Sequence, residues 1–218
     1  MMRIAAWLPV AWVCIQSAPA AGAEKASPAA RAPEETSVCS ACEKRMTIPY
    51  VRAAVVHTVM YAASASLWPE AYSPFLGAEN RARFKKSWTS PPEYHFAPNV
   101  LSSDGDWWYF NLVLHGLFGS EMYLAARDWG RRPATAFVFA VFASTVWEYF
   151  IEAWAKQPSA IDLFFTPAFG ALLGELRFRA VRATYRIRRR PIGLTLRILL
   201  DPFGELERTL MECSLGPY

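Results

Sequence analysis

The sequence predicts an all-α protein, a compact bundle of four to six apolar helices with long irregular connections. Hydrophobic residues make up 53% of the 218 residues and aromatic residues 15%, which is enough for the core of one domain. The apolar residues lie in long stretches bounded by Pro and Gly, which begin and end helices. No stretch is dominated by the alternation of polar and apolar residues that is typical of strands.

The first 23 residues resemble a secretory signal peptide. Arg3 provides a basic start, "IAAWLPVAWVCIQSA" an apolar centre, and "APAAGA" small residues for cleavage. An uncleaved anchor helix is the alternative. Export predicts a protein of the cell envelope, periplasmic and membrane-associated, without indicating the inner or the outer membrane.

Residues 24–47 predict a disordered linker, because Ala, Pro, Glu and Ser dominate its first part and bury little apolar surface. The linker contains Cys39 and Cys42 in a Cys-x-x-Cys motif. In an oxidising compartment these two pair with each other, or one of them pairs with Cys213. We favour such a structural disulfide over redox chemistry, and a zinc site lacks an identifiable fourth ligand.

Residues 48–218 predict a single helical domain, and four stretches of it predict helices. The first covers residues 48–68 and ends before Pro69; the second covers 107–127; the third covers 134–155. A fourth begins after Ser159 and is expected to kink at or be interrupted by Pro167. Residues 69–106 predict a long irregular connection with short helical turns.

The segment after the fourth helix is strongly basic. Four arginines follow helical spacing and predict one basic face: Arg179, Arg182, Arg186 and Arg190. In an exported protein such a face suits anionic membrane lipid or lipopolysaccharide, and not nucleic acid. A solvated surface is the alternative. The apolar stretches are about 12–17 residues long, shorter than a simple membrane span, yet we favour membrane association over a soluble periplasmic bundle.

Acidic residues among apolar ones predict a buried polar cluster. Glu148 and Glu152 are four residues apart and share one helix face, and buried carboxylates need a cation, a metal or a shared proton. His115 on the second helix and Asp162 on the fourth are the candidate partners. They predict a metal or acid–base site with these four as candidate catalytic residues. The alternatives are a buried network that fixes helix register and, for Asp162, a capping role after Ser159.

A divalent metal is a candidate cofactor of this cluster, although the sequence lacks the Glu-x-x-His pair of known bundle sites. Further polar residues are expected at its rim or in ligand binding: Asn111, Arg127, Ser159, Thr166, Glu175 and Arg177. Gly119, one turn after His115, would let something approach closely. Gly170 and Gly174, four apart on one face, would allow close helix packing.

These motifs, "DGDWWYFNLVLHGLFGSEMYLAARDWG" and "STVWEYFIEAWAKQPSAIDLFFTPAFGALLGELRFR", resemble the uncharacterised bacterial family known as domain of unknown function 3943. The resemblance covers roughly residues 70–205. It rests on an Asn-x-x-x-His segment, Gly-Ser, Tyr-x-x-x-Arg, Ser-x-x-Trp-Glu-Tyr-x-x-Glu, Pro-Ser-x-x-Asp-Leu and Thr-Pro-x-x-Gly-x-x-x-Gly-Glu. Gly116 departs from the pattern, which has Pro there.

The resemblance implies an envelope protein of Gram-negative-type bacteria and assigns no activity. The sequence therefore predicts an exported, membrane-associated protein whose cluster is structural or binds a polar lipid headgroup. The alternative is a metal-dependent or acid–base enzyme that acts on an envelope lipid, with His115 as base or ligand. Protein partners are not indicated.

Overall fold

The computed structural model describes residues 34–210 apart from 73–76, 97–98 and 103–105, and only the backbone of 34–45. The expected signal peptide and Cys213 lie outside the described residues. Cys39 and Cys42 lie on the first helix, with side chains outside the described part, so their disulfide stays a prediction.

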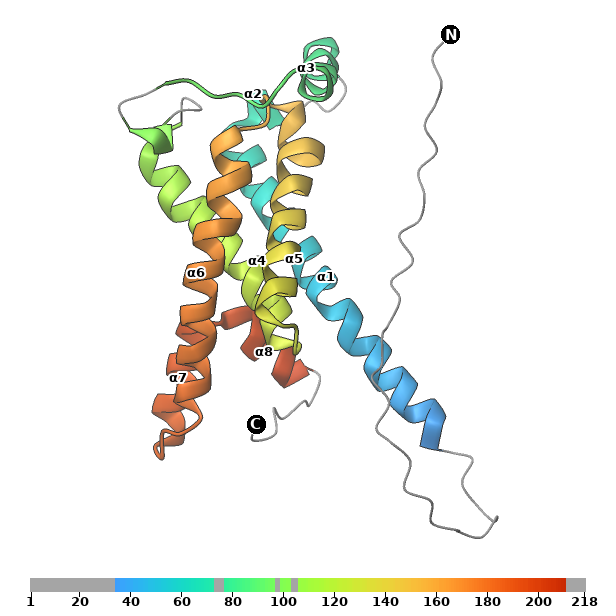
Figure 1. Cartoon of the computed structure of the whole chain (residues 1–218), viewed down its shortest axis with the longest axis vertical. Coiled ribbons are helices and arrows are strands. Elements are labelled where there is room, and N and C mark those ends of the chain that lie inside the picture. Colours follow the sequence, from blue (N-terminus) through green and yellow to red (C-terminus); the bar gives the residue numbers. More distant parts are fainter. Residues whose placement is uncertain (1–33, 73–76, 97–98, 103–105, 211–218) are drawn as a thin grey trace.

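Four long helical segments form a bundle, with short helices at both of its ends (Figure 1). The bundle consists of α1 (Glu34–Leu67), η2 (Phe110–His115) with α4 (Gly116–Asp128), α5 (Pro133–Val146) with η3 (Trp147–Ile151) and η4 (Glu152–Trp154), and α6 (Ala160–Thr184). One end carries α2 (Pro69–Tyr72), α3 (Ala78–Thr89) and η1 (Val100–Ser102); the other carries α7 (Arg190–Leu200) and α8 (Pro202–Leu210). The prediction of an all-α fold is confirmed, with more helices than expected.

The hydrophobic core lies where α4 meets α5 and α1. Its buried members are Val56, Phe118, Met122, Tyr123, Ala126, Ala136, Phe139, Ala140, Ala143 and Trp147. The small residues of α5 allow this helix to lie close to the larger side chains of α4. The core therefore fixes α4 as the central helix, and both polar sites described below depend on its position.

Glycines bring α4 and α6 into backbone contact. A Cβ atom on Gly119 would overlap the carbonyl of Thr166, and one on Gly170 would overlap the backbone of Gly119. On Gly174 a Cβ would lie 3.0 Å from the carbonyl oxygen of Ser120. The predicted packing role of Gly170 and Gly174 is confirmed, and the group that approaches Gly119 is α6; only glycine allows backbones this close.

The predicted linker is wrong from Glu34 onward, because α1 already begins there. Its Glu, Ala, Lys and Arg residues are good helix formers, and extending an existing helix adds one hydrogen bond for each residue fixed. The expected interruption at Pro167 is also wrong, since α6 continues through this buried proline. The predicted connection 69–106 contains α3, a full helix of 12 residues that was not expected.

The four arginines predicted to share a helix face do not do so. Helix α6 ends at Thr184, Arg186 lies in the following turn, and Arg190 begins α7. The Thr184 hydroxyl donates to the Val181 carbonyl at 2.6 Å, and Pro191 stands in the first turn of α7. The arginines remain exposed and gather around this turn, so the basic surface exists in another form.

One helical segment of the described residues, Pro133–Trp154, is long and apolar enough by length and composition to cross a membrane. It spans 22 residues, and the core helix of a soluble protein meets the same criterion. This segment corresponds to the predicted third helix, which the structure confirms as the consecutive elements α5, η3 and η4.

Candidate functional site

Three predicted site residues meet at one end of the bundle. His115 ends η2, Glu148 lies in η3 and Asp162 lies in the first turn of α6. One donor atom of each lies within 4.8 Å of the others, and His115 Nδ1 is 3.5 Å from Asp162 Oδ1. We call these three residues the His115 cluster; the predicted meeting of side chains from three helices is confirmed.

The start of α6 holds the two carboxylates of this cluster in place. The backbone N–H of Ser159 donates to Glu148 Oε2 at 2.8 Å, and the backbone N–H of Asp162 donates to the Ser159 hydroxyl at 3.1 Å. Ser159 is therefore the N-cap that the sequence predicted. The Ser144 hydroxyl donates to the Asp162 carbonyl at 3.3 Å, which joins α5 to the same turn.

Glu152 lies beside the cluster and has its own partners. The indole N–H of Trp147 donates to Glu152 Oε2 at 2.7 Å, and the Tyr72 hydroxyl donates to Oε1 at 3.2 Å. Lys156 Nζ is 3.9 Å from Oε1 and 2.5 Å from Asp106 Oδ2. Burial raises the pKa of Tyr72, and Glu152 adds to this effect, so the phenol stays protonated as a donor.

Two more predicted residues support the cluster. Thr166 Oγ1 lies 3.2 Å from His115 Nδ1, and the Asn111 amide donates to the Leu101 carbonyl at 2.7 Å. Both side chains are fully buried. Thr166 therefore orients the imidazole, and Asn111 fixes the chain that leads into η2.

A cavity of about 420 Å³ opens beside His115 and Glu152. Polar residues line one part of it: Ser64, Tyr72, Asp106, His115, Glu152 and Lys156. Its apolar lining includes Met60, Trp68, Phe110 and Leu114, which also line a second cavity of about 430 Å³. The lining of the second cavity is mostly apolar and extends along α1 and α4 to Phe203, and it also includes Glu121 and Arg177.

The prediction that Arg127, Glu175 and Arg177 lie at the rim of this cluster is wrong. Glu175 stands thirteen residues beyond Asp162 on the same helix, which is about 20 Å at 1.5 Å per residue. Arg127 Nε donates to Glu175 Oε2 at 2.9 Å, and the Tyr123 hydroxyl donates to the same atom. These residues join α4 to α6 near the opposite end of the bundle.

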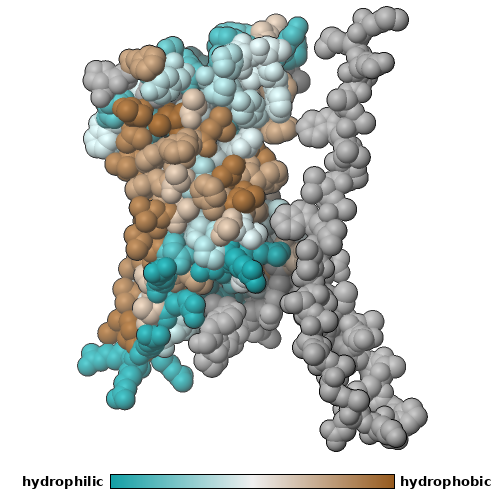
Figure 2. All heavy atoms as spheres, viewed as in Figure 1, coloured by the Kyte–Doolittle hydropathy of each residue, from teal (hydrophilic) through white to brown (hydrophobic). Residues whose placement is uncertain are grey.

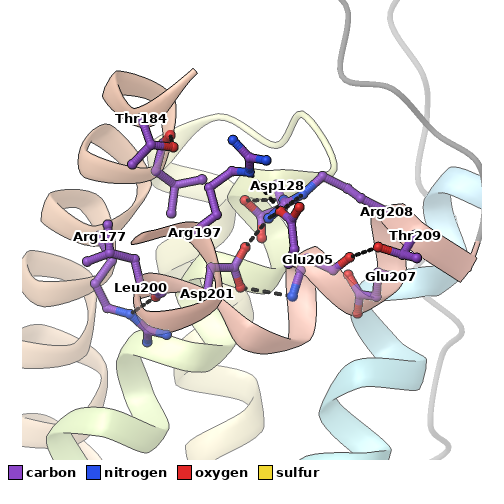
Figure 3. Close-up of polar contacts among 12 residues, drawn as sticks. Asp128, Arg177, Thr184, Arg197, Leu200, Asp201, Glu205, Glu207, Arg208 and Thr209 are labelled. Atoms are coloured by element: carbon purple, nitrogen blue, oxygen red, sulfur yellow. Dashed lines mark hydrogen bonds and ion pairs between the residues drawn. The ribbon is translucent and has the colours of Figure 1, made fainter. Parts of the chain in front are cut away.

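A second buried charged cluster, which was not predicted from the sequence, surrounds Arg52 at that end. The Arg52 guanidinium, fully buried, donates to Glu121 and Asp128, the latter at 3.0 Å, and to Asp201 at 2.5 Å. Two further arginines complete it: Arg177 donates to Glu121 at 2.9 Å and Arg208 to Asp201 at 2.9 Å. Figure 3 shows the part around Asp201 and Arg208. We call these residues, with Glu207, the Arg52 network.

Two carboxyl groups of the Arg52 network have opposite pKa shifts. Burial raises the pKa of Asp128 well above its ordinary value, and the charge of Asp201 raises it further. Burial opposes ionisation of Asp201 as well, but Arg52 and the hydrogen bond from Asp128 lower its pKa below the ordinary value. The opposite shifts favour a proton on Asp128 over one on Asp201.

One sequence signal could have revealed the network. Arg52 is followed by an uncharged stretch from Ala53 to Trp68, and a lone charge on an apolar helix requires a buried partner. Its partners come from α4, from the α7–α8 junction and from α8, so no local spacing links them.

Comparison with protein families agrees with this arrangement. Residues 100–203 match the model described as "Domain of unknown function (DUF3943)". This segment is a DUF3943 domain. The match is shorter than the resemblance at 70–205, and it contains His115, Glu148, Glu152 and Asp162. No curated protein and no solved structure matches the chain.

The boundaries of the match separate the two clusters. All three residues of the His115 cluster lie inside the DUF3943 domain, whereas Arg52, Glu207 and Arg208 of the Arg52 network lie outside it. The domain therefore contains a complete candidate site, while the second cluster depends on α1 and α8.

Proposed function

We propose that this protein is an exported, membrane-embedded component of the cell envelope that binds the polar headgroup of an anionic lipid beside the His115 cluster. The observation that carries the proposal is the pair of adjoining cavities. They share Met60, Ser64, Trp68, Phe110 and Leu114 as lining residues. One is partly polar and the other apolar, the combination that an amphiphile requires.

Lys156 is the residue best placed to bind a lipid phosphate. It is the only Lys or Arg among the described residues that line the polar cavity. Its ammonium contacts Asp106 and lies near Glu152, so it is held at the cavity wall. A headgroup phosphate would accept from this ammonium, while an acyl chain would lie along Leu114, Leu117 and Phe118 of the apolar cavity.

The outer surface supports a membrane location. Large apolar side chains are exposed on every long helix, among them Val55, Val59, Val138, Phe142, Phe150, Phe164, Leu172 and Leu176. In Figure 2 the hydrophobic colour covers the middle of the visible face, and hydrophilic residues gather toward its ends. An exposed apolar surface this extensive is unusual for a soluble monomer and suits contact with lipid tails.

The two ends of the bundle also fit the two surfaces of a membrane. Near the end with α2 and α3, exposed aromatic residues include Trp68, Trp88, Trp107, Trp108 and Tyr109. Exposed arginines surround the α6–α7 turn at the other end. Aromatic rings favour the interfacial region, and arginines favour anionic headgroups.

Native mass spectrometry of protein purified in a mild detergent tests the proposal. We expect the wild-type chain to retain one phospholipid. Lys156→Gln removes the phosphate donor and Leu114→Trp fills the wall shared by both cavities, so each should reduce retention at least fivefold. Lys85→Gln, an exposed lysine on α3, is the matched control and should retain lipid as the wild type does.

Two results would contradict the proposal. One is a chain that leaves the membrane fraction on alkaline carbonate extraction, which would exclude membrane embedding. The other is equal lipid retention in wild type, Lys156→Gln and Leu114→Trp, which would place any bound lipid outside the cavities.

An enzyme that acts on the same lipid is the second candidate. It is favoured by one observation: His115 lines the polar cavity and its imidazole lies 3.5 Å from the Asp162 carboxylate. A carboxylate beside an imidazole stabilises the charged imidazolium that forms in general base catalysis. Turnover of headgroup-labelled phospholipid in reconstituted vesicles, lost in His115→Ala, would support it; lipid binding without turnover would not.

A further inference from the structure

We propose that His115, Glu148 and Asp162 bind a divalent transition-metal ion, with Zn²⁺ as the best match. Their side chains come from η2, η3 and α6, and one donor atom of each lies within 4.8 Å of the others. The three donors offer one imidazole nitrogen and two carboxylate oxygens, and zinc binds each of these donor types. This inference goes beyond lipid binding and does not depend on it.

Glu148 provides the second, independent observation. Its side chain is fully buried, and its Oε2 accepts from the backbone N–H of Ser159 at 2.8 Å. Its other oxygen, Oε1, is buried and accepts no hydrogen bond from the residues that the structure describes. An ionised carboxylate in such a place needs a cation, because burial removes the stabilisation that water provides.

The surroundings of the cluster hold the ligands in position. Asp162 is fixed by the first turn of α6, where its backbone N–H donates to Ser159. Thr166, one turn later, contacts His115 Nδ1 at 3.2 Å. Donor atoms on one zinc ion, at bond lengths of about 2.1 Å, lie roughly 3–3.5 Å apart. The three donors now lie within 4.8 Å of one another, so side-chain rotation would have to bring them closer to reach that spacing.

The site would keep an open position toward the polar cavity. His115 is the ligand that lines this cavity, whereas Glu148 and Asp162 are buried behind it. Three protein ligands with a position open to solvent or substrate are typical of catalytic zinc, and structural zinc has four protein ligands. A bound ion could therefore accept an oxygen of a phosphate or of water from the cavity.

Metal content and titration test the site in the full-length protein. We expect about one equivalent of metal after purification in zinc-containing buffer, measured by plasma mass spectrometry. Titration of metal-stripped protein with Zn²⁺ should give a dissociation constant in the micromolar range or below. Glu148→Gln and Asp162→Asn should each weaken binding at least tenfold, because each removes one charged ligand.

Glu175→Gln is the matched control, since Glu175 is a partly buried carboxylate with Arg127 and Tyr123 as partners and lies about 20 Å from Asp162 along α6. It should bind Zn²⁺ within threefold of the wild type. His115→Ala, at a cavity wall, provides a further variant in case the buried ones fail to fold. Substitution with Co²⁺ gives a visible absorption band whose intensity reports coordination number and needs no variant.

Either of two outcomes would overturn the inference. Wild-type protein that binds neither Zn²⁺ nor Co²⁺ above the level of exposed carboxylates would exclude the site. Binding that is equally strong in wild type, His115→Ala and Glu148→Gln would place the metal elsewhere. Lipid retention is measured without metal, so failure here leaves the lipid-binding proposal to its own test.

Discussion

The two buried charged clusters lie toward opposite ends of the same bundle and differ in how their carboxyl groups are paired with cations. In the Arg52 network three arginines face four carboxyl groups, and burial and the charge of Asp201 raise the pKa of one of these, Asp128. In the His115 cluster two carboxyl groups share a small space with one imidazole. The charges of the Arg52 network are paired within the protein, so a structural role accounts for them. The His115 cluster has more carboxyl groups than cationic partners and requires a cation or a proton.

This contrast gives a physical criterion for separating a register-fixing network from a binding site. A buried ion pair that is complete and hydrogen-bonded can persist without any ligand. A buried carboxylate whose second oxygen has no donor, as in Glu148, is stabilised by a cation or by a proton. Substitutions at the two clusters should therefore change stability in opposite directions.

The largest effect is expected for Arg52→Met, which removes the central cation of the Arg52 network and leaves its carboxylates buried. We expect a loss of about 3–5 kcal/mol in the free energy of unfolding. Denaturant unfolding in mild detergent, followed by circular dichroism, measures it. Arg179→Met, at an exposed ion pair with Glu175, is the control and should cost less than about 1 kcal/mol. Equal effects would refute the contrast between buried and exposed pairs.

The substitutions Asp201→Asn and Asp128→Asn should differ in their effect on stability, because the two carboxyl groups have opposite pKa shifts. Asp201 is the ionised partner of Arg52 and Arg208, so its loss should cost about 3 kcal/mol at pH 7. Asn at position 128 resembles the protonated carboxyl that the site favours, so this variant should be nearly neutral. Comparable destabilisation by both substitutions would contradict the proton assignment.

The same pair predicts a pH dependence. The raised pKa of Asp128 contributes stability that is present below its ordinary value of 3.8 and is lost as pH rises through the folded value. The lowered pKa of Asp201 contributes stability that is present above 3.8 and is lost as pH falls through the folded value. The free energy of unfolding, measured from pH 3 upward, should therefore fall less steeply above pH 4 in Asp128→Asn than in wild type.

A smaller effect of opposite sign is expected for Glu148→Gln. With a chelator present, the substitution removes a buried charge, while the amide oxygen can still accept from the Ser159 backbone. Stability should rise by about 1–2 kcal/mol. Added Zn²⁺ should reverse the order by stabilising only the wild type. A Glu148→Gln protein that is less stable than wild type in chelator would indicate that the carboxylate already has a cationic partner.

The smallest effect on stability is expected at the exposed arginines. Replacing Arg179, Arg182, Arg186 and Arg190 together by Gln should change the free energy of unfolding by less than about 1 kcal/mol. It should nevertheless weaken the attachment of the α6–α7 turn to anionic vesicles, measured as quenching of a turn-attached fluorophore by headgroup quenchers at low salt. Quenching that does not change with charge or salt would exclude a lipid-phosphate role for this surface.

The site was easier to predict than its surroundings. Glu148, Glu152 and Asp162 stand out because each interrupts an apolar stretch, and Ser159 has the spacing of an N-cap. The structure places Glu148, Asp162 and Ser159 together with His115, and Glu152 beside them. The positions of Arg127, Glu175 and Arg177 were predicted wrongly because a charge near a helix end has no local indicator of its partner. Arg52 illustrates the same limit, with hydrogen-bond partners 69 to 149 residues away.

The sequence by itself determined the four long helical segments, most of their ends and the glycine face, because propensity, capping and period act within a few residues. It also determined that acids would be buried in an apolar bundle. Only the tertiary structure decided which cation faces which acid, that α6 continues through Pro167, and that the basic segment turns after Thr184. The physical reason is that ion pairing and burial depend on distances between helices, and residues far apart in the chain set those distances.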